Sequence, residues 1–211
     1  MSWTAWLVSC LTFQAGWFAC VLGAARGTPI AGVVLVAALV TGHLALSRRR
    51  LADAAFLGAS GLFGYAADSA LVLAGWIRFP EPAALGGPSA LWMVALWVLF
   101  ASTLEGCMSW LRDRWVLAAG LGAVSGPLSY LAGARLGAIE LAEPAAAPLA
   151  AIGVTWAAAM PVLLALHGAT RRLFARGSLI PHGLRDPGSP VPAVDARVLP
   201  REERGAEETG S

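Results

Sequence analysis

The sequence contains no lysine, only three histidines and three cysteines, and 13% charged residues among its 211 residues. Without lysine there is no Gly-Lys phosphate loop, which disfavours an ATPase. Three scattered histidines are too few for the His-rich clusters of membrane di-iron desaturases. The chain also has no CxxC pair and no Gly-x-Ser-x-Gly elbow, which disfavours zinc ribbons and serine hydrolases. No cofactor and no metal are therefore expected, and the sparse charge gives no surface for nucleic acid.

Hydrophobic residues are abundant instead, at 57% of the chain, with a mean hydropathy of +0.66. A water-soluble domain of this size could hardly hide so much apolar surface, so an integral membrane protein is expected. The first apolar segment has no basic region before it and no convincing cleavage site after it, so we expect a retained helix. The three cysteines lie inside apolar segments and are interpreted as small packing residues.

Six apolar runs of about twenty residues are each long enough to cross a bilayer as a helix. The runs are Thr4–Ala25, Pro29–Ser47, Ala54–Trp76, Ser89–Leu111, Trp115–Ala138 and Ala146–Thr170. The connections between them are short, so consecutive helices should be antiparallel neighbours. The predicted fold class is all-α, a polytopic membrane helix bundle of about six transmembrane helices within residues 1–176.

Arginines are distributed unevenly between the two ends of this bundle. Eight fall at one end, namely Arg48, Arg49, Arg50, Arg112, Arg114, Arg171, Arg172 and Arg176. The other end carries three arginines and three glutamates, namely Arg26, Arg78, Arg135, Glu81, Glu140 and Glu143. Because cytoplasmic loops are enriched in basic residues, both termini are predicted to be cytoplasmic.

The composition changes from residue 177 onward, where proline, glycine, arginine and glutamate dominate. Such a segment cannot bury enough apolar area to offset the entropy of its chain. Residues 177–211 are therefore predicted to be a disordered cytoplasmic tail, with a partner-binding tail as the less favoured alternative.

Asp68 is a carboxylate in the middle of the apolar run Ala54–Trp76. A charge at that depth costs roughly 2.5 to 3.5 kcal/mol on insertion scales, so Asp68 should be protonated, paired or in a wet cavity. Arg135, near the outer end of the fifth helix, is expected to reach inward and pair with it. A protonatable Asp68 used in transport is the alternative, and a structural ion pair is favoured.

Four further polar side chains are placed inside the predicted bundle. Glu105, His43 and His167 lie roughly 5 to 10 Å inside the cytoplasmic boundary, counted at 1.5 Å per residue. Each is interpreted as an interfacial residue that reaches water, and a clustered proton relay or metal site is left open. Gln14 is expected to face the bundle, because an amide in lipid would lack partners.

The fifth helix contains the phrase Ser125-Gly-Pro127-Leu-Ser-Tyr130. Proline removes a backbone donor, so a kink with freed carbonyls is predicted near residues 124–126. Broken helices line the sites of many transporters, but most such prolines merely bend a helix, and a bend is favoured here.

Three glycine pairs have the spacing of four residues that places both glycines on one helix face. They are Gly23 with Gly27, Gly122 with Gly126, and Gly133 with Gly137, and they are interpreted as bundle packing, with dimerisation as the alternative. Trp17, Trp97 and Trp156 lie deep in the predicted helices and are likewise interpreted as packing residues.

Four phrases together resemble a known family: FQAGWFACVLGA, the Asp68 helix, LWMVALWVLFASTLEGCMSWL and GPLSYLAGARLGA. They are similar to the bacterial membrane-protein family called domain of unknown function 2878, over about residues 8–170. The resemblance implies a small multi-helix protein of the bacterial inner membrane, with no established activity and a lipid-related role favoured. The positions that it emphasises are Gln14, Trp17, Asp68, Trp97, Pro127, Tyr130, Gly133 and Arg135.

The functional prediction is a small transporter-like or lipid-associated accessory protein that is not itself an enzyme. Its expected partners are the lipid bilayer, a lipid or small-molecule substrate, and a second copy of the chain. The alternative is a structural or assembly protein in which Asp68 and Arg135 only lock the bundle. An intramembrane lipid-modifying enzyme that uses Glu105 with His43 or His167 is the third, least favoured reading.

Overall fold

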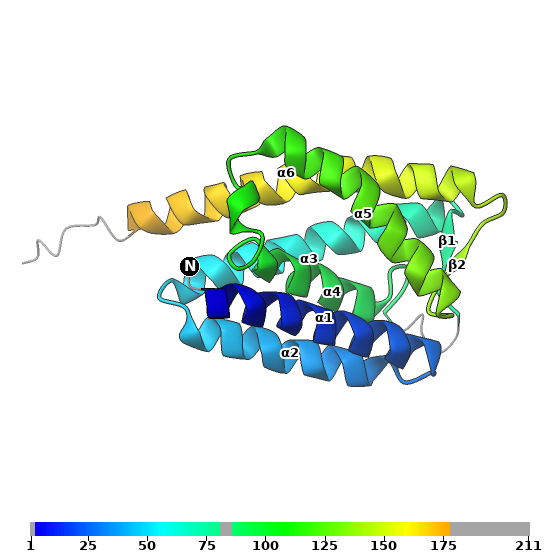
Figure 1. Cartoon of the computed structure of the whole chain (residues 1–211), viewed down its shortest axis with the longest axis horizontal. Coiled ribbons are helices and arrows are strands. Elements are labelled where there is room, and N and C mark those ends of the chain that lie inside the picture. Colours follow the sequence, from blue (N-terminus) through cyan, green and yellow to red (C-terminus); the bar gives the residue numbers. More distant parts are fainter. Residues whose placement is uncertain (1–2, 81–85, 178–211) are drawn as a thin grey trace, which may run out of the picture. The chain divides into compact units, whose positions relative to one another are not determined.

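The structure, a computed structural model, describes residues 3–80 and 86–177 of the chain (Figure 1). In chain order the elements are α1 (Trp3–Ala25), α2 (Pro29–Leu46), α3 (Arg50–Leu73), β1 (Ile77–Arg78), α4 (Leu91–Thr103), the 3-10 helix η1 (Ser109–Leu111), α5 (Trp115–Arg135), β2 (Glu140–Leu141) and α6 (Ala146–Gly177). The predicted tail, residues 177–211, lies outside the described residues beyond Gly177.

Helices α3 and α4 form the middle of the bundle. Helix α4 contacts α1, α2 and α3, and α3 also packs against α6. Figure 1 shows the helix pair α1/α2 on one side of this middle layer and the pair α5/α6 on the other. One face of α3 is buried against these helices, and both of its aspartates, Asp53 and Asp68, lie on that face.

Within residues 3–80 and 86–177, five of the six α-helices are long and apolar enough to cross a membrane, namely α1, α2, α3, α5 and α6. The sixth, α4, is apolar but has only 13 residues. The chain is a helical membrane bundle, which confirms the all-α fold predicted from the six apolar runs.

Helix α4 ends at Thr103, eight residues before the predicted end at Leu111. The Thr103 hydroxyl donates to the carbonyl of Phe100 at 2.6 Å, and the chain continues in turns to η1. Hydroxyls that bond to nearby carbonyls compete with helix continuation, and Gly106 adds a poor helix former. A side chain at Gly106 would also collide with Ser9 of α1, so the turn needs glycine there.

A two-stranded antiparallel ribbon, absent from the predicted elements, joins two of the connections between helices. Ile77 pairs with Leu141 and Arg78 with Glu140. The Arg78 guanidinium also donates to the Glu140 carboxylate, with Nε and Oε2 at 3.0 Å. Two residues are too few for an alternating pattern, so only the approach of the two connections in space defines this ribbon.

Only one of the three glycine pairs forms a packing face inside the bundle. Gly122 and Gly126 both lie against Trp156 of α6, where a side chain would collide. Gly27 and Gly137 instead follow the ends of α1 and α5, with φ of 73° and 85°. This left-handed conformation favours glycine and stops a helix, so interpreting these two glycines as helix-face residues was wrong.

Helix α5 continues through Pro127 without a break in its assignment. The missing proline N–H would have bonded to the carbonyl of Ala123, four residues earlier. That carbonyl faces Gly153 of α6, where an added Cβ would lie 3.1 Å from it. The freed carbonyl is therefore covered by the neighbouring helix, one residue before the predicted stretch 124–126.

Candidate functional site

Asp68 is completely buried in the middle layer, and both of its carboxylate oxygens have a partner. The indole Nε1 of Trp97, on α4, donates to Oδ2 at 2.8 Å. The hydroxyl of Tyr130, on α5, donates to Oδ1. One carboxylate thus holds three helices together, and its burial cost is reduced because neither oxygen is left unpaired.

The predicted partner of Asp68 was wrong, because Arg135 is exposed and makes no ion pair with it within the described residues. Tyr130 occupies that place instead. Arg135 follows Tyr130 by five residues, which turns its side chain by about 140° around the helix axis. Depth along the helix axis is independent of this rotation, so Arg135 can lie near the depth of Asp68 and still point away from it.

Tyr130 and Trp97 also form part of the wall of a cavity of about 390 Å³. Helices α1, α4, α5 and α6 supply the lining, which is mainly aromatic and aliphatic. Gln14, Ser125 and Leu128 line this cavity and are exposed on the surface of the bundle. The cavity therefore opens sideways between α1 and α5, where the apolar part of a bilayer would lie.

The mouth of the cavity is crossed by one hydrogen bond between helices. Trp17 Nε1 on α1 donates to Ser129 Oγ on α5 at 3.1 Å. Trp17 was interpreted as a packing residue, and its polar tip gives it this second role. Gln14, expected to face the bundle, lines the cavity while remaining exposed.

Two tryptophans stack in the cavity wall. The rings of Trp97 and Trp156 lie 4.4 Å apart at an interplanar angle of 12°, and Phe100 meets Trp156 edge-on at 5.2 Å. The Trp156 Nε1 atom is buried and lies beside the Tyr130 hydroxyl, but it makes no well-formed hydrogen bond within the described part of the chain. A buried N–H that is poorly satisfied is costly, so it is a candidate donor to a ligand.

A second group of polar residues lies at the end of the bundle that is predicted to be cytoplasmic. Glu105, in the turn after α4, has Oε1 at 3.0 Å from His167 Nε2 and 2.6 Å from Arg171 Nη2. Its other oxygen, Oε2, lies 3.6 Å from His43 Nε2. The three residues that the sequence placed at one depth are thus adjacent, and the early end of α4 turns Glu105 toward the histidines.

Asp53, at the start of α3, belongs to the same group and was missed by the sequence analysis. It is 2% exposed, its Oδ1 lies 3.2 Å from Arg171 Nη2, and Ser47 donates to its Oδ2. The third apolar run begins at Ala54, so Asp53 falls in the predicted loop before it. Asp53 follows three arginines, and an acidic residue is favourable in the first turn of a helix. These two features could have placed Asp53 in the first turn of the third helix.

The pKa of Glu105 is held well below its ordinary value by its neighbours. Burial raises the pKa, but His167, His43 and Arg171 together lower it by more. Glu105 is therefore a carboxylate that keeps its charge, and Arg171 bridges it to Asp53.

The comparisons with known proteins agree with the geometry at the level of family. Neither the curated proteins nor the solved structures contain a match to this chain. Residues 6–162 match a family described as protein of unknown function (DUF2878). This range includes all but the first three residues of α1, all of α2 to α5, the whole cavity wall and the Asp68 contacts. The chain is a membrane protein that belongs to the DUF2878 family.

Proposed function

We propose that this protein is a lipid-associated accessory protein of the bacterial inner membrane that binds an apolar molecule taken from the bilayer. The bound molecule would be an acyl chain or a small apolar compound that enters between α1 and α5. Both termini would face the cytoplasm, as the arginine distribution predicts.

The observation that carries this proposal is the cavity that opens sideways. Its volume of about 390 Å³ falls within the range of about 300 to 1,000 Å³ usual for small-molecule sites. Such sites are mainly apolar with a few polar groups that orient the ligand. Trp156 Nε1 and the Gln14 amide supply those groups here.

The wall of the cavity is held in position by Asp68. Trp97 and Tyr130 are both packed inside the bundle, and the carboxylate additionally fixes the polar end of each side chain. Cavity shape then depends on a buried group that does not line the cavity. Binding therefore accounts for the presence of a carboxylate at this depth.

Filling the cavity tests the proposal. Gly133 is buried and lines the cavity, and a Cβ there would make only ordinary contacts, the nearest at 3.6 Å to Ile139. The variant Gly133→Leu should lose a bound phospholipid or fatty acid that native mass spectrometry detects on the wild type. Gly120→Leu, on the open surface of the same helix, is the matched control. Equal lipid occupancy in both variants would contradict the proposal.

A structural role is the second candidate function, and the Asp68 contacts favour it. Both oxygens of Asp68 are used within the bundle, and they connect α3 with α4 and α5. In this alternative the cavity is incidental, and the protein is a structural or assembly protein of the membrane, as a monomer or a dimer, with no transport role. Unchanged lipid binding in Gly133→Leu, together with loss of stability in Asp68 variants, would favour this candidate.

A further inference from the structure

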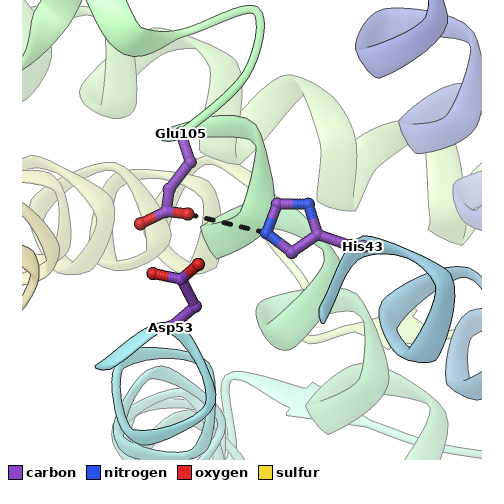
Figure 2. A group of neighbouring side chains, drawn as sticks. All are labelled: His43, Asp53 and Glu105. Atoms are coloured by element: carbon purple, nitrogen blue, oxygen red, sulfur yellow. Dashed lines mark ion pairs between the residues drawn. The ribbon is translucent and has the colours of Figure 1, made fainter. Parts of the chain in front are cut away.

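Three side chains from separate elements meet at the end of the bundle that is rich in arginine. His43 comes from the last turn of α2, Asp53 from the first turn of α3, and Glu105 from the turn after α4 (Figure 2). One ligand atom from each can be chosen so that all three atoms lie within 4.8 Å of one another. Neither the family description nor the cavity proposal assigns these residues a role.

We propose that His43, Asp53 and Glu105 form a binding site for a divalent transition-metal ion of the Zn²⁺ type. One imidazole nitrogen and two carboxylate oxygens are ligands that Zn²⁺ accepts, with bonds of about 2.0 to 2.2 Å. Ligand atoms around a tetrahedral ion with such bonds lie about 3.3 to 3.6 Å apart, so the side chains would have to close by up to about 1.5 Å around the ion.

Each carboxylate has one oxygen held by the protein and one that accepts no hydrogen bond. Ser47 donates to Asp53 Oδ2, while Asp53 Oδ1 is buried without a hydrogen-bond partner among the described residues. For Glu105, Oε1 carries the contacts to His167 and Arg171, whereas Oε2 faces His43 Nε2 at 3.6 Å, beyond hydrogen-bond distance. Outer contacts that fix ligand orientation in this way are usual around metal ions.

His43 Nε2 is also buried without a hydrogen-bond partner in the part of the chain that the structure describes. Asp53 Oδ1 has only its ion pair with Arg171 at 3.2 Å, and His43 Nε2 has only its contact with Glu105 Oε2 at 3.6 Å. Buried polar atoms that make no hydrogen bond are costly unless a ligand satisfies them. Their convergence on one point is independent of the acidic character of the group. It indicates a cation held by nitrogen and oxygen.

Arg171 is the positive charge that now offsets the two carboxylates. Its Nη2 lies 3.2 Å from Asp53 Oδ1 and 2.6 Å from Glu105 Oε1. A divalent ion bound to Oδ1 would compete with this guanidinium, so Arg171 should weaken metal binding. If the group were only a structural ion pair, removal of Arg171 would not strengthen zinc binding. An Arg171 variant therefore distinguishes a metal site from an ion pair.

The site borders an open cavity of about 330 Å³, which Arg48, Arg49 and Arg112 also line. Three protein ligands leave a fourth position of a tetrahedral ion free for water or another ligand. The arginines at the rim favour an anion in that position, such as a phosphate group.

Zinc binding to the purified full chain, without a histidine tag, tests the proposal by calorimetry near neutral pH. The wild type should bind one Zn²⁺ per chain. His43→Ala and Asp53→Asn should each weaken binding by on the order of tenfold or more, whereas Arg171→Met should tighten it. X-ray absorption on the wild type should show nitrogen and oxygen ligands with one imidazole and no sulfur.

The controls are Asp113→Asn, an exposed carboxylate next to an arginine of the rim, and His182→Ala, which removes the histidine that is neither a proposed ligand nor a partner of Glu105. Both should bind zinc like the wild type. Absence of zinc binding by the monodisperse wild type would overturn the proposal. So would zinc binding that His43→Ala leaves unchanged, or a sulfur-rich ligand shell. None of these three results depends on whether Asp53→Asn folds.

Discussion

The sharpest prediction concerns Asp68, because its replacement by asparagine and by leucine should lower the stability of the protein by very different amounts. Asparagine keeps an oxygen that accepts from Trp97 Nε1, and its amide can donate to the phenolic oxygen of Tyr130. Leucine leaves both buried donors without a partner, at about 1 to 3 kcal/mol each, so about 2 to 6 kcal/mol together. Asp68→Asn should cost less than about 1.7 kcal/mol, the upper end measured for hydrogen bonds between membrane helices.

Reversible unfolding in mixed micelles, followed by circular dichroism, measures this difference. In the double variant Asp68→Leu with Tyr130→Phe, the unpaired hydroxyl disappears. The unfolding free energy that this variant loses should therefore be smaller than the sum of the two single losses, by on the order of 1 kcal/mol. Asp68→Leu with Arg135→Ala should be additive, because Arg135 is exposed and turned away. Equal losses for asparagine and leucine, or additivity in both cycles, would refute the reasoning.

Three further predictions concern packing, the cavity mouth and the charged group. Gly126→Ala should destabilise the protein by about 1 to 3 kcal/mol, because its Cβ would collide with the Trp156 ring, whereas Gly120→Ala should not. Ser129→Ala should cost about 0.6 to 1.7 kcal/mol through loss of the hydrogen bond across the cavity mouth. In the presence of a chelator, the wild type should lose stability as the pH falls below 4.5, the ordinary pKa of glutamate, and Glu105→Gln should lose less.

The sign of this pH effect follows from the direction of the pKa shift. The pKa of Glu105 is lower in the folded protein than in the unfolded chain. The unfolded state therefore takes up a proton first as the pH falls, so the stabilisation is complete above that range and is lost below it. Parallel pH profiles for the wild type and Glu105→Gln would contradict the assigned contacts of Glu105.

For Gly126→Ala and Ser129→Ala, the control variant Gly120→Ala separates specific from general losses of stability.

The long helices were predictable because each apolar run had to be long enough to cross a bilayer and satisfy its own backbone. The ends were less predictable, since they depend on local contacts. Helix α4 stops at Thr103 because of its hydroxyl and the glycine three residues later, and α6 continues past Thr170 to Gly177. Apolarity was therefore a guide to the existence of helices and a poor guide to where they end.

The candidate sites were predictable in depth but not in direction around the helix. Counting residues placed Glu105, His43 and His167 at one level, and the structure brings them together. The same counting placed Arg135 near Asp68, yet the rotation of α5 presents Tyr130 instead. Depth depends on position along one helix, whereas facing depends on how every helix is rotated by its neighbours.

By itself, the sequence determined that this is a helical membrane bundle of the DUF2878 family with a buried carboxylate that needs partners. Only the tertiary structure decided that Trp97 and Tyr130 are those partners. It also decided where the bundle opens to the bilayer and that Asp53 lies beside His43 and Glu105. The reason is physical. The cost of an isolated charge in lipid is a property of one segment, whereas its compensation requires donors from other segments, and packing alone decides which ones arrive.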